Sequence, residues 1–224
     1  MKNILMNREM TKAILDGRKT QTRRVVKADP IIYDNPVLLE PDSCVKFNFS
    51  AGGCQNYSAT PLFVNPKYQK GDIVWVREPA SVDFITIHDE MGFHYLSDNK
   101  TAKIKFPERL FNQNEDTNFL PKWAFLCQGV PNGCIKEMAR CFIKIIDVRV
   151  EKLQNIKPID ICKEGCSLTK TRNPLEDINT DYNKVYKWFI NLWNKTAPKG
   201  YKWEDDPYVF VYEFKRVNKD GSEL

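Results

Sequence analysis

The sequence contains little of what metal sites and disulfide frameworks require. It has only two histidines, and its seven cysteines include no Cys-x-x-Cys pair. Structural zinc sites are built from closely spaced cysteine and histidine ligands, so we expect neither a metal nor a cofactor. An odd number of cysteines without paired spacing favours a reducing compartment.

Long apolar runs are also missing. No segment approaches the roughly 18 apolar residues that a membrane helix requires, and residues 1–7 carry no secretory apolar segment. We therefore expect a cytoplasmic protein without a membrane partner.

The apolar content is nevertheless sufficient for a core. Of the 224 residues, 42% are hydrophobic and 12% are aromatic, which suits one domain with insertions, or at most two small domains. The net charge of +5 is compatible with a nucleic-acid partner but does not require one.

The densest group of polar side chains follows a short helical pattern. Residues 18–24 (RKTQTRR) contain four cations and two threonines. Cations can bind an anionic ligand, and threonine supplies a donor, an acceptor and a possible nucleophile. The alternative is a solvated basic turn that leads into an edge strand. These residues alone do not separate the two interpretations.

Local patterns predict the elements around this segment. Asn7 suits a helix N-cap and Gly17 a left-handed C-cap, so the first helix should end where the basic segment begins. Further helices are predicted from Pro158 to Gly165 and over 182–194. Strands are predicted near 20–26, 73–78, 141–150 and 208–217, and a hairpin over 83–97 with its turn at 90–92. Four apolar residues should share one face of the strand 141–150: Phe142, Ile146, Val148 and Val150.

Four stretches in order resemble the ASCH domain family, whose fold is related to the PUA domain. Residues 14–24 (ILDGRKTQTRR) resemble its opening motif, and residues 70–78 (KGDIVWVRE) resemble its Gly-Asp turn and following strand. Residues 146–154 with Glu164 and Gly165 resemble its central strand and helix, and residues 206–217 resemble its closing strand. The likeness is closest to the longer ASCH proteins that phages and prophages often encode.

This resemblance implies an α+β fold, a PUA-like small β-barrel with flanking helices. It implies one domain over residues 1–224, with insertions at about 28–66 and 98–134. The family's general theme is RNA or nucleotide binding. In a small bacterial branch, a Lys-x-x-Thr pair and a glutamate remove the acyl group from acylated cytidine, and Lys19, Thr22 and Glu164 occupy the matching positions.

The leading hypothesis is therefore recognition of RNA or a modified nucleoside. Whether the protein also hydrolyses its ligand stays open; if it is an enzyme, we expect removal of an acyl group from an acylated nucleoside. The cations expected to hold phosphate or carbonyl oxygens are Arg18, Lys19, Arg23, Arg24 and Lys27. Trp75 or Tyr95 is expected to stack a base. A non-catalytic RNA-binding module and a factor that binds a host protein remain alternatives.

Two glutamates have alternative interpretations. Glu78 ends an apolar strand, so it either orients a ligand or forms a structural ion pair with Arg18, Arg23 or Arg77. Glu164 ends a helix, where the dipole disfavours its negative charge and should raise its proton affinity. A carboxylate of this kind is suited to act as an acid or base. The alternative for Glu164 is an exposed glutamate at a helix end.

Overall fold

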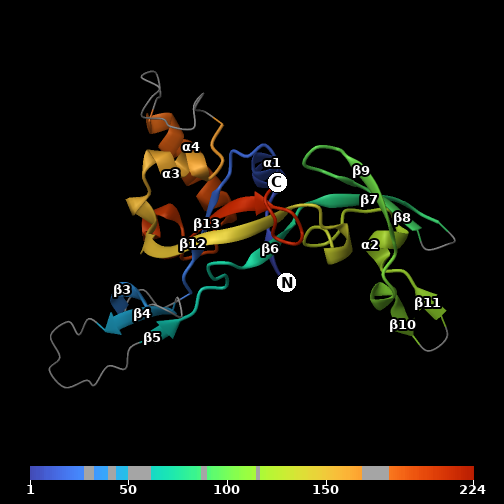
Figure 1. Ribbon diagram of the computed structural model, residues 1–224, viewed down its shortest axis with the longest axis horizontal. Helices are drawn as coiled ribbons and strands as arrows, with labels where there is room; N and C mark the ends of the chain where they lie inside the picture. Colours follow the sequence, from blue (N-terminus) through green and yellow to red (C-terminus); the bar gives the residue numbers. More distant parts are fainter. Residues whose placement is uncertain (28–32, 40–43, 50–61, 87–89, 115–116, 168–181) are drawn as a thin grey trace. The chain divides into compact units, whose positions relative to one another are not determined.

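Figure 1 shows the computed structural model, a mixed α+β protein, which confirms the expected class. The structure describes residues 1–27, 33–39, 44–49, 62–86, 90–114, 117–167 and 182–224. The chain divides into two compact units. Unit 1 comprises residues 1–16, 73–143 and 216–224, and unit 2 comprises residues 17–72 and 144–215.

Unit 1 begins with a strand and a short helix. Strand β1 (Lys2–Leu5) pairs in parallel with β6 (Ile73–Arg77). Helix α1 (Arg8–Leu15) begins after Asn7, whose side-chain oxygen accepts a hydrogen bond from the backbone of Met10 at 2.8 Å. The next glycine, Gly17, has a φ of 73°, so the predicted helix start and stop are both confirmed.

An antiparallel sheet of β7 (Ala80–Ile85), β8 (Glu90–Tyr95) and β9 (Thr101–Lys105) forms the other part of unit 1. The predicted hairpin is confirmed, but its predicted turn at 90–92 is wrong because these residues belong to β8. Met91 is fully buried and Gly92 lies against the Phe84 ring. Because Met91 and Gly92 pack in the interior, β8 begins at Glu90 and not after the glycine, as the turn-like composition suggests.

Residues 98–134 contribute to the core of unit 1. They supply β9, the 3-10 helix Glu108–Leu110, the hairpin β10 (Asn112–Asn114) and β11 (Thr117–Phe119), and α2 (Lys122–Phe125). Phe106, Ala124 and Val130 are buried in one apolar cluster with Trp75 and Phe93. A second 3-10 helix, Lys136–Met138, precedes β12.

Unit 2 is built on three neighbouring strands. Strand β13 (Tyr208–Val217) lies between β12 (Phe142–Lys152) and β2 (Gln21–Val25), and it is antiparallel to β2. Helices α3 (Pro158–Lys163) and α4 (Tyr182–Thr196) lie together beside these strands (Figure 1). Their apolar faces pack on β13 through a cluster that includes Ile161, Phe189 and Val211.

The remaining elements of unit 2 are short. Strands β3 (Tyr33–Leu39), β4 (Cys44–Phe49) and β5 (Leu62–Val64) form a small antiparallel sheet. The 3-10 helices Leu153–Asn155 and Trp203–Asp205 follow β12 and precede β13. Most of the predicted insertion 28–66 outside these strands lies beyond the described residues.

The four predicted strands are confirmed as β2, β6, β12 and β13, and the two later helices as α3 and α4. The predicted face of β12 is partly wrong. Ile146 is 41% exposed, whereas Ile143 and Ile145 are buried. The buried positions shift from odd to even residue numbers between Ile145 and Val148. This long strand therefore does not bury the same face along its whole length.

The described strands form separate sheets, and no closed barrel is detected among them. The PUA-like barrel therefore stays a prediction. None of the helices in the described part of the chain is long and apolar enough to cross a membrane.

Candidate functional site

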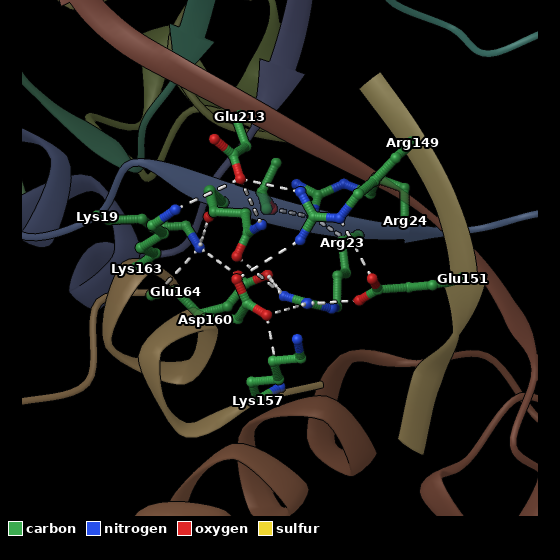
Figure 2. A network of polar contacts seen from close by, with 12 residues as sticks. Lys19, Arg23, Arg24, Arg149, Glu151, Lys157, Asp160, Lys163, Glu164 and Glu213 are labelled. Carbon is green, nitrogen blue, oxygen red and sulfur yellow. Dashed lines mark hydrogen bonds and ion pairs between the residues drawn. The ribbon is translucent and has the colours of Figure 1, made fainter. Parts of the chain in front are cut away.

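The side chain of Lys19 is buried at the start of β2, and its ammonium is fully hydrogen-bonded (Figure 2). The ammonium donates to the backbone oxygen of Gln21 at 2.8 Å and to that of Glu164 at 3.0 Å. It also donates to the Oε2 atom of Glu164 at 2.6 Å. Because an ammonium has three hydrogens, these contacts use its whole donor capacity.

Burial changes the acidity of this ammonium. Loss of hydration lowers the pKa of Lys19 below its ordinary value, and the nearby positive charges of Arg23 and Arg24 add to this effect. The carboxylate of Glu164 acts in the opposite direction. Lys19 therefore releases its proton more readily than a surface lysine.

Glu164 sits at the C-terminal end of α3 and is only 4% exposed. The alternative of an exposed helix-end glutamate is therefore wrong. The helix stops here because Gly165 adopts a φ of 99°, which suits glycine. Two cations compensate the negative charge at this end of the helix. Arg23 donates to Glu164 Oε1 at 2.9 Å, and Lys19 donates to Oε2.

Arg23 is the centre of a larger group of charges, here called the ionic cluster (Figure 2). Its members are Lys19, Arg23, Arg149, Glu151, Asp160, Lys163, Glu164 and Glu213. Arg23 contacts Glu151 at 2.6 Å and Asp160 at 3.7 Å. Its guanidinium is buried and engaged by carboxylates, so its charge serves internal pairing.

The outer members of the ionic cluster hold its inner carboxylates in place. Arg149 bonds Glu213 at 2.9 Å and Glu151 at 3.2 Å, and Lys163 contacts Glu213 at 3.4 Å. A group fixed by several partners loses little further entropy when it acts. The cluster therefore presents Lys19 and Glu164 in one defined geometry.

Thr22 belongs to the opposite face of β2. Side chains alternate along a strand, so Gln21 and Arg23 share the face of the ionic cluster, while Thr22 and Arg24 share the other face. The Oγ1 atom of Thr22 accepts a hydrogen bond from Arg24 at 2.8 Å. Among the described contacts, Thr22 forms no hydrogen bond with Lys19 or Glu164. The structure thus joins two of the three predicted catalytic residues directly.

Two tyrosines beside Thr22 were missed at the sequence level. Tyr212 stands opposite Thr22 in the β13–β2 register, and its ring meets that of Tyr68 edge-on, with centroids 5.1 Å apart. Burial raises the pKa of both phenols to about 12, against the opposing charge of Arg24. The alternation of Phe210 and Tyr212 in the sequence signals an aromatic face, but nothing there points to Tyr68.

The other predicted cations of this region differ in exposure. Lys27 is exposed, and Arg18 and Arg24 are partly buried. Arg18 donates to the backbone oxygen of Gly165 at 2.9 Å, which links the basic segment to the end of α3. Lys27 is thus the most accessible predicted cation for a polyanion.

The remaining predicted ligand residues lie in unit 1. Trp75 is 6% exposed and belongs to the apolar core. The hydroxyl of Tyr95 donates to the Met138 backbone at 2.6 Å, and the guanidinium of Arg140 lies 3.7 Å from its ring centroid. Both residues that were predicted to stack a base are therefore engaged in the packing of unit 1.

Glu78 forms the structural ion pair that was its alternative interpretation, but with a different partner. It is fully buried and accepts hydrogen bonds from Arg140 and from Ser97. The expected pairing with Arg18, Arg23 or Arg77 is therefore wrong. Arg140 lies 62 residues further along the chain, in a region whose strands give no local signal of this contact.

The described residues contain no group of three or more His, Cys, Asp and Glu side chains arranged to hold a metal ion. Comparison with known protein families, curated proteins and solved structures finds no match to this chain.

Proposed function

We propose that this protein binds an acylated nucleoside in unit 2 and hydrolyses the amide bond to its acyl group. The observation that carries the proposal is the 2.6 Å contact between the buried Lys19 ammonium and the Glu164 carboxylate. The resemblance of residues 14–24 to the ASCH motif supports the same assignment, together with a PUA-like barrel as its scaffold.

The reaction adds water across the amide bond. On losing a proton, Lys19 gives up one of its three hydrogen bonds. The lone pair that this frees removes a proton from the attacking water, which the Thr22 hydroxyl orients toward the acyl carbon. The tetrahedral intermediate then collapses, the carbon–nitrogen bond breaks, and the leaving nitrogen takes a proton from the Lys19 ammonium. The products are a carboxylic acid, which releases its proton to the solvent and becomes a carboxylate, and the free amine of the nucleobase. Glu164 keeps Lys19 in position and stabilises its charged form.

The base is recognised on the face that carries Thr22. Arg24 supplies a cation that holds the Thr22 hydroxyl, and its side chain is only partly buried. Tyr68 and Tyr212 are buried beside Thr22, so the plane offered to a base is the Arg24 guanidinium. Guanidinium planes stack nucleobases, which favours a nucleoside over an aliphatic amide as substrate.

The test is release of acetate from N4-acetylcytidine. Wild type should turn over, and Lys19→Met should lose activity, because methionine fills the buried volume without a titratable nitrogen. Thr22→Ser should retain activity that Thr22→Val loses, since only serine keeps the hydroxyl. Lys70→Met, at an exposed position in the same unit, is the matched control and should leave the rate unchanged.

Thermal unfolding of each variant separates a catalytic loss from a folding defect. A folded wild-type protein that releases no acetate would overturn the reaction. Binding of single-stranded RNA without turnover would then favour a non-catalytic RNA-binding module. Absence of RNA affinity as well would favour a factor that binds a host protein.

A further inference from the structure

A pocket of about 680 Å³ lies within unit 1. Its wall combines α1, the turn between β8 and β9, the residue Arg140 before β12, and the end of β13. The volume falls in the range of small-molecule sites, about 300–1,000 Å³. Neither the ionic cluster nor the residues of the proposed reaction contribute to it, so it is a separate candidate site.

Besides Arg140, three cations line this pocket: Lys12, Lys100 and Arg216. Lys12 and Lys100 are exposed, and no ion pair joins either of them to another residue in the described part of the chain. Arg216 donates to the backbone oxygen of Leu15 at 3.3 Å, which fixes its guanidinium at the end of α1. Because these three side chains come from α1, β13 and the β8–β9 connection, the fold gathers them around one space.

The acidic groups of the pocket do not cancel this charge. Asp98 accepts bonds of 2.8 and 2.9 Å from Arg140, which also pairs with Glu78. Asp16 is the other acidic residue of the lining. The lining thus sets four cations against two carboxylates, and this positive excess favours an anion such as a phosphate monoester.

Arg140 provides a flat surface in the same pocket. Its Nε, Nη1 and Nη2 atoms are engaged by Glu78 and Asp98, and Nη2 also contacts Ser97. One face of its guanidinium lies over the Tyr95 ring. The side chain is still 22% exposed, and it lines the pocket. Guanidinium planes stack well on nucleobases.

We propose that this pocket binds a nucleoside monophosphate unit. The base stacks on the Arg140 guanidinium, and the phosphate contacts Lys12, Lys100 and Arg216. The ligand is either a free mononucleotide or the 5′-terminal nucleotide of an RNA strand, since both present the same chemistry. This site goes beyond the proposed amide hydrolysis, because it belongs to unit 1 and uses none of the catalytic residues.

The experiment is isothermal titration of the full chain with AMP, CMP, GMP and UMP at low salt. Lys100→Ala should weaken nucleotide binding about tenfold, the cost of one charge-assisted phosphate contact. Lys105→Ala is the matched control, because this lysine is exposed on β9 but does not line the pocket. Affinity that is equal in Lys100→Ala and wild type would overturn the site.

Stacking must be tested from the side of the ligand, because removing Arg140 would leave Glu78 buried without its cation. Ribose 5-phosphate keeps the phosphate but lacks the base, and it should bind at least about tenfold more weakly than the nucleotide, given the usual strength of base stacking. Equal affinities would overturn the stacking role of Arg140.

Two RNA hexamers, with and without a 5′-phosphate, distinguish the sources of the ligand. A free-nucleotide site should bind AMP more tightly than either hexamer, whereas a strand-end site should prefer the phosphorylated hexamer. In both cases AMP and the phosphorylated hexamer should compete. A wild-type protein that binds neither would overturn the proposal.

Discussion

The guanidinium of Arg140 holds both carboxylate oxygens of Glu78, through Nε and Nη2, at 2.9 Å each. This bidentate geometry is the strongest form of an arginine–carboxylate contact. Glu78 is fully buried and Arg140 is 22% exposed, so the carboxylate of the pair is shielded from solvent. Its value lies in keeping a buried charge satisfied, since an unpaired carboxylate in the core is very unfavourable.

Arg140→Ala should therefore lower the free energy of unfolding by about 3–5 kcal/mol, the usual cost of breaking a buried pair. Arg109→Ala provides the control, because its pair with Glu137 lies at the surface, where such pairs contribute about 1 kcal/mol or less. Urea denaturation measures both. Equal losses in the two variants would contradict the shielding argument.

The stability of the protein should fall in alkaline solution because of Tyr68 and Tyr212. Both have a folded-state pKa of about 12, above the value near 10 of an unfolded tyrosine. Between these values the unfolded chain loses a proton that the folded chain keeps, so stability is complete below pH 10 and is lost as the pH rises through 12. Each tyrosine should contribute on the order of 2 kcal/mol to this loss.

Tyr68→Phe should reduce that alkaline loss while changing stability much less at pH 7. Urea denaturation between pH 7 and pH 12 gives the slope directly. An unchanged slope between pH 10 and pH 12 would show that Tyr68 ionises equally well in the folded and unfolded chains.

The rate of the proposed amide hydrolysis should increase with pH as Lys19 loses its proton. Because the pKa of Lys19 is lowered from its ordinary value of 10.5, the rate should reach its plateau below that pH. Arg24→Met removes one of the charges that lower this pKa, so its plateau should shift to higher pH. A profile that is identical in the variant would mean that a group other than Lys19 accepts the proton.

Gly165→Ala should destabilise unit 2 by about 1–2 kcal/mol. The φ of 99° at this position places a β-carbon in conflict with the neighbouring backbone, as in other left-handed conformations. Gly129→Ala is the control, since an added methyl group there would meet only the Ala80 oxygen at 3.9 Å. Urea denaturation of the two variants should show a larger loss of unfolding free energy for Gly165→Ala than for Gly129→Ala. Equal losses would refute the requirement for glycine at position 165.

Binding of single-stranded RNA, measured by a salt titration, should depend on the exposed Lys27. Lys27→Ala should weaken binding similarly for all sequences and reduce the salt slope by about one phosphate contact. Arg23→Ala should act mainly by lowering stability, because its guanidinium is engaged inside the ionic cluster. A stable Arg23→Ala protein with selectively lost RNA affinity would contradict this assignment.

Local signals predict much of the fold. Asn7 and Gly17 mark the two ends of α1 because a side-chain cap and a left-handed glycine act within one helical turn. The limits of α3 follow in the same way from Pro158 and Gly165. Burial is less local. Ile146 matches the apolar alternation of β12 yet is exposed, because the packing on each part of a strand decides which face is covered.

The candidate site shows the same division. Lys19 and Glu164 are 145 residues apart in the chain, and their pairing was expected only through the resemblance to the ASCH motif. The partner of Glu78 was missed because Arg140 follows a polar and irregular stretch without a recognisable motif. Contacts between distant side chains depend on topology, which hydrophobic periodicity does not encode.

The three hydrogen bonds of Lys19 also restrict how this sequence can diverge. The Lys19 Nζ atom joins the start of β2 to the end of α3 through these hydrogen bonds. The atom proposed for proton transfer therefore also stabilises the fold. A descendant that no longer needed turnover would still be selected to keep this lysine for its fold. Retention of Lys19 among future relatives would then be poor evidence of activity, whereas the Thr22 hydroxyl, whose described hydrogen bond stays within β2, would be the better marker.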